Sequence, residues 1–121
     1  MLKFAANLDF MFTREAFSLV DRIKLAAAAG FKGVEIPYPY EVNPSLLAAA
    51  NESSGVEQIL LNSSPGDLSA GEFGIAIFPE RREEFREKLE LSVTYLKVCT
   101  LGYFLLSTNK FLSSHFISML C

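Results

Sequence analysis

The sequence predicts an α/β protein in which parallel strands alternate with helices, and three observations support this. Short apolar segments are each followed by a longer segment whose apolar residues recur every three or four positions. Strands that alternate with helices pair in parallel, because a crossover connection is needed to return the chain to the same end of the sheet. The 121 residues are 50% hydrophobic and 21% charged, which is typical of one globular domain.

The first strand is expected at residues 2–10 and the first helix at residues 14–29. Thr13 is the candidate N-cap, and Gly30 is expected to take the left-handed conformation that often follows a helix. Apolar residues at three- and four-residue spacing predict the helix face that packs on the sheet. They are Ala16, Leu19, Val20, Ile23, Ala26 and Ala27.

The second unit repeats this pattern. Its strand is expected at residues 33–38. Asn43 followed by Pro44 predicts a helix start with a cap and a proline in the first turn. This helix is expected to end near Gly55.

The third strand is expected at residues 58–62, and a loop rich in Ser, Pro, Gly and Asp follows it to Phe78. Residues 79–97 predict the third helix. Its apolar face is expected to hold Phe85, Leu89, Val93 and Leu96.

Alternate residues of a strand face opposite sides of the sheet. In the third strand we therefore expect Gln58, Leu60 and Asn62 to lie on the more polar face. Ile59 and Leu61 are expected to face the helices.

The candidate substrate-binding residues are Asn7, Glu35 and Asn62, which come near the carboxyl ends of the three strands. Parallel α/β folds bind their ligands at this end of the sheet. Two structural alternatives stay open. Glu35 can form an ion pair inside the fold, and Asn7 and Asn62 can hold loop backbone in place.

Four segments carry a resemblance to a known family: FAANL at residues 4–8, GFKGVEIPYPY at 30–40, LLNSSPGD at 60–67 and GEFG at 71–74. In this order and spacing they resemble the N-terminal part of the hydroxypyruvate isomerase family, one of the xylose-isomerase-like TIM barrels. The resemblance covers residues 2–97. It divides the chain into a partial TIM barrel at residues 1–97 and an out-of-family hydrophobic tail at 98–121, expected to be irregular or helical.

The resemblance implies conversion of hydroxypyruvate to tartronate semialdehyde by proton transfer through an enediolate. This chemistry needs a carboxylate base and a group that stabilises the enediolate oxygen. In the family, glutamates on later strands do this work, and a divalent metal is often present. A TIM barrel has eight strands, so the resemblance implies three β/α units of a truncated barrel that is inactive alone. No catalytic residue, metal ligand or cofactor is assigned within these residues.

Several functions stay open at this stage. The chain can act as an isomerase once another chain supplies the later strands and a small hydroxy-keto acid binds. It can instead be a non-catalytic isoform that binds or modulates the full-length isomerase, or associates with itself. A fragment of a related sugar epimerase-type barrel is a further alternative.

Nucleic acid and membrane are not expected as partners. The 11 basic residues are scattered among 14 acidic ones, and no apolar run reaches the length of a membrane span. The chain shows no signal-peptide pattern, which predicts a cytoplasmic protein with Cys99 and Cys121 reduced. His115, the single histidine, has no neighbours at metal-ligand spacing.

Overall fold

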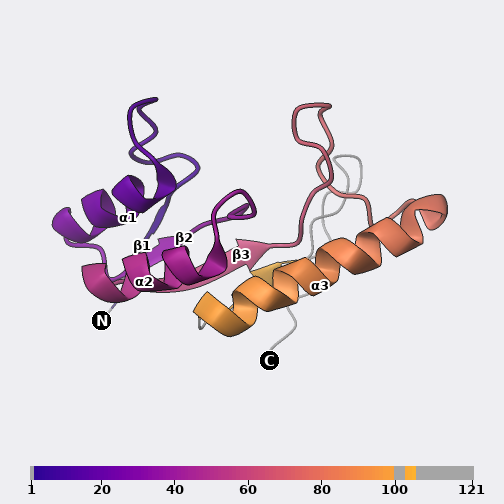
Figure 1. Ribbon diagram of the computed structural model, residues 1–121. Helices are drawn as coiled ribbons and strands as arrows, with labels where there is room; N and C mark the ends of the chain where they lie inside the picture. The colour runs from indigo at the N-terminus through magenta and orange to yellow at the C-terminus, as the bar shows by residue number, and fades with distance from the viewer. Residues whose placement is uncertain (1, 100–102, 106–121) are drawn as a thin grey trace.

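The computed structural model describes residues 2–99 and 103–105 and contains a parallel sheet of four strands (Figure 1). The strands follow one another in the order β1-β2-β3-β4, and each pairs in parallel with the next. They are β1 (Ala5–Asn7), β2 (Gly33–Glu35), β3 (Glu57–Asn62) and β4 (Tyr103–Leu105). The α/β class predicted from the sequence is confirmed.

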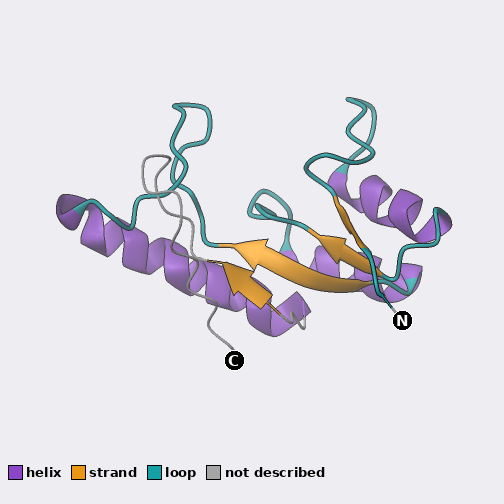
Figure 2. Ribbon diagram, turned by 180° about the vertical axis from the view of Figure 1, so that it is seen from behind, coloured by secondary structure: helices purple, strands orange, loops and turns teal. Residues whose placement is uncertain are grey.

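Three helices connect the strands and pack side by side, α1 against α2 and α2 against α3. They are α1 (Leu19–Ala28), α2 (Pro44–Ser54) and α3 (Arg82–Cys99), with a short 3-10 helix (Pro79–Arg81) before α3. Figure 2 shows all three on one side of the sheet. No described helix covers the other face.

Local sequence signals set the ends of α2 as predicted. Asn43 is the N-cap, and its Oδ1 accepts a hydrogen bond from the backbone N–H of Ser45 at 2.9 Å. Pro44 occupies the first turn, where no intrahelical N–H is needed. Gly55 ends the helix with a φ of +66°, a conformation that costs glycine little.

The start of α1 differs from the prediction. The helix begins at Leu19, and Ser18 replaces Thr13 as N-cap because it forms a reciprocal pair with Asp21. The Ser18 hydroxyl accepts from the Asp21 N–H at 3.2 Å, and the Asp21 carboxylate accepts from the Ser18 N–H at 3.0 Å. At the other end, Gly30 has the expected positive φ, +94°.

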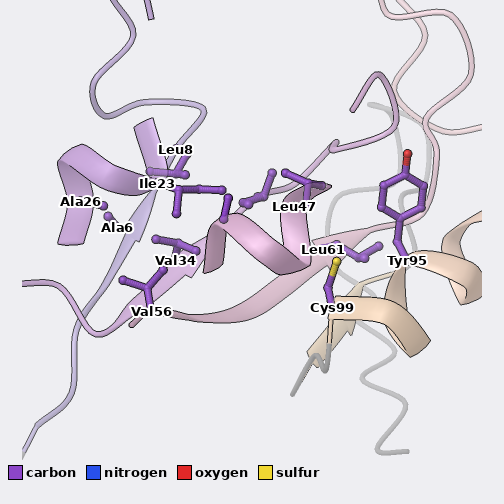
Figure 3. Close-up of a cluster of buried hydrophobic side chains, with 12 residues drawn as sticks. Ala6, Leu8, Ile23, Ala26, Val34, Leu47, Val56, Leu61, Tyr95 and Cys99 are labelled. Atoms are coloured by element: carbon purple, nitrogen blue, oxygen red, sulfur yellow. The ribbon is translucent and has the colours of Figure 1, made fainter. Parts of the chain in front are cut away.

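The hydrophobic core lies between the sheet and the helices (Figure 3). It receives side chains from β1, β2 and β3 and from all three helices. The buried members are Ala6, Leu8, Ile23, Ala26, Val34, Ile36, Leu47, Ala50, Val56, Leu61, Tyr95 and Cys99.

The buried face of α3 differs in part from the predicted one. Phe85, Leu89 and Leu96 are partly buried, but Val93 is 37% exposed. Ser92 and Tyr95 point inward instead, because their hydroxyls find hydrogen-bond acceptors on the β2–α2 connection and on α3 itself.

A β-bulge in β3 reverses part of the predicted side-chain alternation. Val34 pairs with Gln58 but Glu35 pairs with Leu60, so Ile59 is an extra residue. Gln58 therefore lies on the helix side and is buried, and Asn51 of α2 donates a hydrogen bond to it. Ile59 lies on the other face beside Gly33. The prediction that Gln58 lies on the polar face and Ile59 toward the helices is wrong.

Regular structure continues beyond Lys97. The proposed boundary between residues 97 and 98 falls inside α3, and Cys99 packs into the core. β4 then adds a strand parallel to β3 that was not predicted from the sequence, pairing Leu60 with Tyr103 and Asn62 with Leu105. The rest of the predicted tail, residues 100–102 and 106–121, lies outside the described residues.

Two further observations concern the described residues only. None of their helices is both long and apolar enough to cross a bilayer. Cys99 is a free thiol, and burial raises its pKa. Cys121 lies outside the described residues.

Candidate functional site

The carboxyl ends of β1, β2 and β3 meet at one edge of the sheet, as parallel pairing requires. Asn7 and Glu35 are the last residues of their strands and are direct neighbours in the register. Asn62 extends past the end of β2, where its backbone N–H donates to the carbonyl oxygen of Pro37 at 2.9 Å. The structure therefore joins Asn7 with Glu35 directly and places Asn62 farther along β3.

Asn7 and Glu35 form a half-buried hydrogen-bonded pair. The Asn7 Nδ2 donates to Glu35 Oε2 at 3.0 Å, and Asn7 Oδ1 accepts from the backbone N–H of Asp9 at 3.0 Å. Asn7 thus holds the loop after β1, as the structural alternative expected. Among the described residues Glu35 forms no ion pair. A carboxylate accepts several hydrogen bonds, so Glu35 can take a further donor.

Asn62 differs from Asn7 because its side-chain oxygen is buried and has no hydrogen-bond partner among the described residues. Its backbone, in contrast, is held on both sides. The N–H donates to Pro37, and the carbonyl oxygen accepts from the hydroxyl of Tyr40. Buried polar atoms are nearly always paired, and leaving one unpaired costs about 1–3 kcal/mol. Asn62 Oδ1 is therefore an unsatisfied acceptor near this edge of the sheet.

Asp9 and Arg22 form a second polar group behind the end of β1. Burial raises the pKa of Asp9, and the positive charge of Arg22 partly opposes this. Arg22 reaches from α1 to the Leu8 carbonyl oxygen at 3.4 Å, while its Nε is buried and finds no partner within residues 2–99 and 103–105. Sequence analysis missed both residues, because nothing in their spacing shows that α1 returns to this strand end.

The loop after β3 is fixed to the start of α3. Glu72 accepts from the backbone N–H of Asp67 at 2.6 Å and pairs with Arg81, which also donates to Glu84 at 2.7 Å and 2.8 Å. Hydrogen bonding to Arg81 lowers the pKa of Glu72. Gly66 makes this arrangement possible, because a Cβ there would lie 2.1 Å from Glu72 Oε2. The loop that follows Asn62 is therefore anchored to the start of α3 through Glu72 and Arg81.

In the part of the chain that the structure describes, no three His, Cys, Asp or Glu side chains come together closely enough to hold an ion. His115 lies outside that part.

Comparison with family models finds no match, but individual proteins are clearly similar. The chain is 44% identical over 101 residues to a putative hydroxypyruvate isomerase from Danio rerio, covering 82% of this chain and 36% of that protein. It is 43% identical over 95 residues to a 2-oxo-tetronate isomerase from Pectobacterium atrosepticum, covering 78% and 36%. A hydroxypyruvate isomerase from Escherichia coli is 38% identical over 97 residues, covering 80% and 37%. The chain thus spans little more than a third of these relatives.

A solved structure supports the fold assignment. The crystal structure of an AP endonuclease, family 2, from Brucella melitensis superimposes with a TM-score of 0.81 at 33% sequence identity. The match covers 93% of this chain and 44% of that one. The described sheet and helices are therefore part of a TIM-barrel architecture.

Proposed function

We propose, from the premise that the matched part of this chain belongs to the hydroxypyruvate isomerase family, that its strand ends bind the substrate of a hydroxypyruvate isomerase-type reaction. That reaction moves a proton between neighbouring carbons of a small hydroxy-keto acid through an enediolate, giving tartronate semialdehyde from hydroxypyruvate. Substrate binding and proton transfer need different groups, and the two parts of the proposal are argued separately.

The observation that carries the binding part is the buried Oδ1 of Asn62, for which the described part of the chain offers no hydrogen-bond donor. Hydroxypyruvate has a terminal hydroxyl that donates one hydrogen bond, which matches this acceptor. Glu35 stands at the same edge with Asn7 holding one of its oxygens, and its negative charge favours the hydroxyl end of the substrate over the carboxylate end. The three residues would therefore orient the substrate and do not themselves transfer the proton.

The second part of the proposal is that these 121 residues do not isomerise the substrate on their own. Proton transfer requires a base within hydrogen-bond reach of the carbon acid and a group that stabilises the enediolate. The resemblance assigns these roles to glutamates on later strands, and the described sheet has four strands where a closed barrel has eight. A longer isomerase chain that supplies the later strands would complete the site.

Isothermal titration of the purified chain with hydroxypyruvate tests the binding part. Asn62→Ala should raise the Kd about tenfold, because one buried hydrogen bond to the ligand is lost. Asn51→Ala is the matched control: Asn51 is also buried with an unpartnered Oδ1, but it lies on the helix side. Equal losses in both variants, or no binding by the wild-type chain, would contradict the proposal. 2-Oxo-tetronate, named in several relatives, is the comparison ligand.

A coupled isomerase assay, run with and without a divalent metal, tests the second part. The chain alone should show no turnover. Turnover by the purified chain would overturn the non-catalytic part and leave the binding part standing.

A further inference from the structure

Two tyrosine hydroxyls lie behind the end of β3 in a largely buried cluster. Tyr40 follows β2 and its hydroxyl contacts both the backbone carbonyl oxygen of Asn62 and, at 2.7 Å, the Oγ of Ser92 on α3. The ring of Tyr95 meets that of Tyr40 edge to face, with centroids 5.2 Å apart. The Tyr95 hydroxyl donates to Val42 O at 2.7 Å, lies at a longer 3.3 Å from the backbone carbonyl oxygen of Tyr40, and points away from Leu61 and Cys99 (Figure 3).

Two hydroxyl hydrogens, those of Tyr40 and Ser92, serve three contacts in this cluster. The Asn62 carbonyl can only accept, so the single hydroxyl hydrogen of Tyr40 goes to it. The hydrogen of Ser92 is shared between the Tyr40 oxygen at 2.7 Å and the carbonyl oxygen of Lys88 at 2.9 Å. Ser92 is fully buried. Burial raises the pKa of Tyr40 to about 12, so the hydroxyl keeps its hydrogen at neutral pH.

Asn62 is held from three directions. Its N–H is bound to Pro37, its carbonyl to Tyr40, and its residue position pairs with Leu105 of β4. The chain leaves the sheet immediately after Asn62 to enter the loop toward α3. Without the Tyr40 bond the peptide after Asn62 would lose a restraint at the point where strand pairing stops. The direction of the Asn62 side chain depends on that backbone geometry.

We propose that Tyr40 is a positioning residue: its hydroxyl, supported by Ser92, holds the Asn62 backbone so that Oδ1 points to the bound substrate. This inference rests on the proposed function only for the role of Asn62 as ligand acceptor. The restraint of Asn62 by Tyr40 is a property of the free chain and is measured separately. Tyr40 touches the positioned residue and is not assigned contact with the substrate.

The experiment compares Tyr40→Phe with Tyr95→Phe in the full chain. Each substitution removes one hydroxyl from the same cluster and keeps the ring, so the two variants are matched in size and place. Of the two tyrosine hydroxyls, that of Tyr40 bonds to Asn62 and that of Tyr95 does not. The readouts are the Kd for hydroxypyruvate and the NMR resonances of the Asn62 side-chain amide in the free chain. Asn62→Ala identifies those resonances.

Tyr40→Phe should raise the Kd about five- to tenfold and shift or broaden the Asn62 amide resonances, as loss of one hydrogen bond predicts. Tyr95→Phe should leave the Kd within about twofold and the Asn62 resonances in place. Similar effects from both variants would overturn the proposal in favour of general destabilisation. Unchanged Asn62 resonances in Tyr40→Phe would overturn it directly. If the wild-type chain does not bind hydroxypyruvate, the proposed function fails, and the resonances still decide whether Tyr40 positions Asn62.

Discussion

The buried pair of Asn51 and Gln58 offers a direct test of the bulge in β3. Asn51 Nδ2 donates to Gln58 Oε1 at 3.3 Å, and the two residues are 6% and 1% exposed. Asn51 Oδ1 and Gln58 Nε2 have no hydrogen-bond partner in the part of the chain that the structure describes. The pair exists only because the bulge turns Gln58 toward α2. Without the bulge, Gln58 would lie on the opposite face and the two side chains would be independent.

The expected energies follow from what each substitution leaves behind. Gln58→Leu alone leaves the Asn51 amide buried without any partner, which costs about 1–3 kcal/mol and is partly offset by the buried leucine. Asn51→Ala alone leaves the Gln58 amide buried without a partner at a similar cost, which the higher helix propensity of alanine partly offsets. The double variant buries neither amide. We expect it to be less destabilised than the sum of the single variants, with a coupling free energy of about 1–2 kcal/mol.

Urea unfolding of the wild type, both single variants and the double variant measures this coupling. Far-UV circular dichroism and tyrosine fluorescence should report the same transition, which justifies a two-state free energy of unfolding. If the effects add to within about 0.5 kcal/mol, the two side chains do not interact. That result would refute both the hydrogen-bonded pair and the bulge that creates it.

Two further predictions concern the loop after β3 and the tyrosine cluster. Gly66→Ala should destabilise the chain clearly more than Gly30→Ala in the same urea assay. A Cβ on Gly66 would lie 2.1 Å from Glu72 Oε2 and 2.8 Å from Ile75 Cγ2. Gly30 also has a positive φ, but a Cβ there would meet nothing within 4 Å. Gly30→Ala should lower the free energy of unfolding by only about 1 kcal/mol, the cost of a left-handed backbone for alanine. Equal losses of stability in the two variants would contradict the close approach at Gly66. The second prediction follows from the Tyr40 pKa of about 12 in the folded chain against 10.0 for a free tyrosine. Between these values the unfolded chain binds fewer protons than the folded chain, so stability should fall as pH rises from about 10 to 12. The fall should be shallower in Tyr40→Phe when urea midpoints are compared across that range, and identical slopes would count against the buried hydroxyl.

The sequence was sufficient where the physical cause of a structure is local. Asn43 and Pro44 start α2 through one side-chain bond and one preset φ, and Gly30 and Gly55 end their helices through left-handed backbone. The apolar alternation of the first two strands and the helical periodicity between them were enough to predict parallel β/α units. The proximity of Asn7 and Glu35 was also predictable from the sequence, because the carboxyl ends of neighbouring parallel strands lie at the same edge of the sheet.

Tertiary contacts decided the features that depend on distant partners. The Ser18 cap of α1 is not one of these features, because its reciprocal partner Asp21 lies only three residues away and the pattern is local. The bulge reverses Gln58 and Ile59 because the register with β2 shifts after Val34, and no single-strand pattern contains a register. β4 forms where Tyr103–Leu105 meets the free edge of β3. The link from Ser92 through Tyr40 to Asn62 joins residues 52 and 22 positions apart. Sequence spacing describes neighbours along the chain, whereas that link exists only after the helices have packed on the sheet.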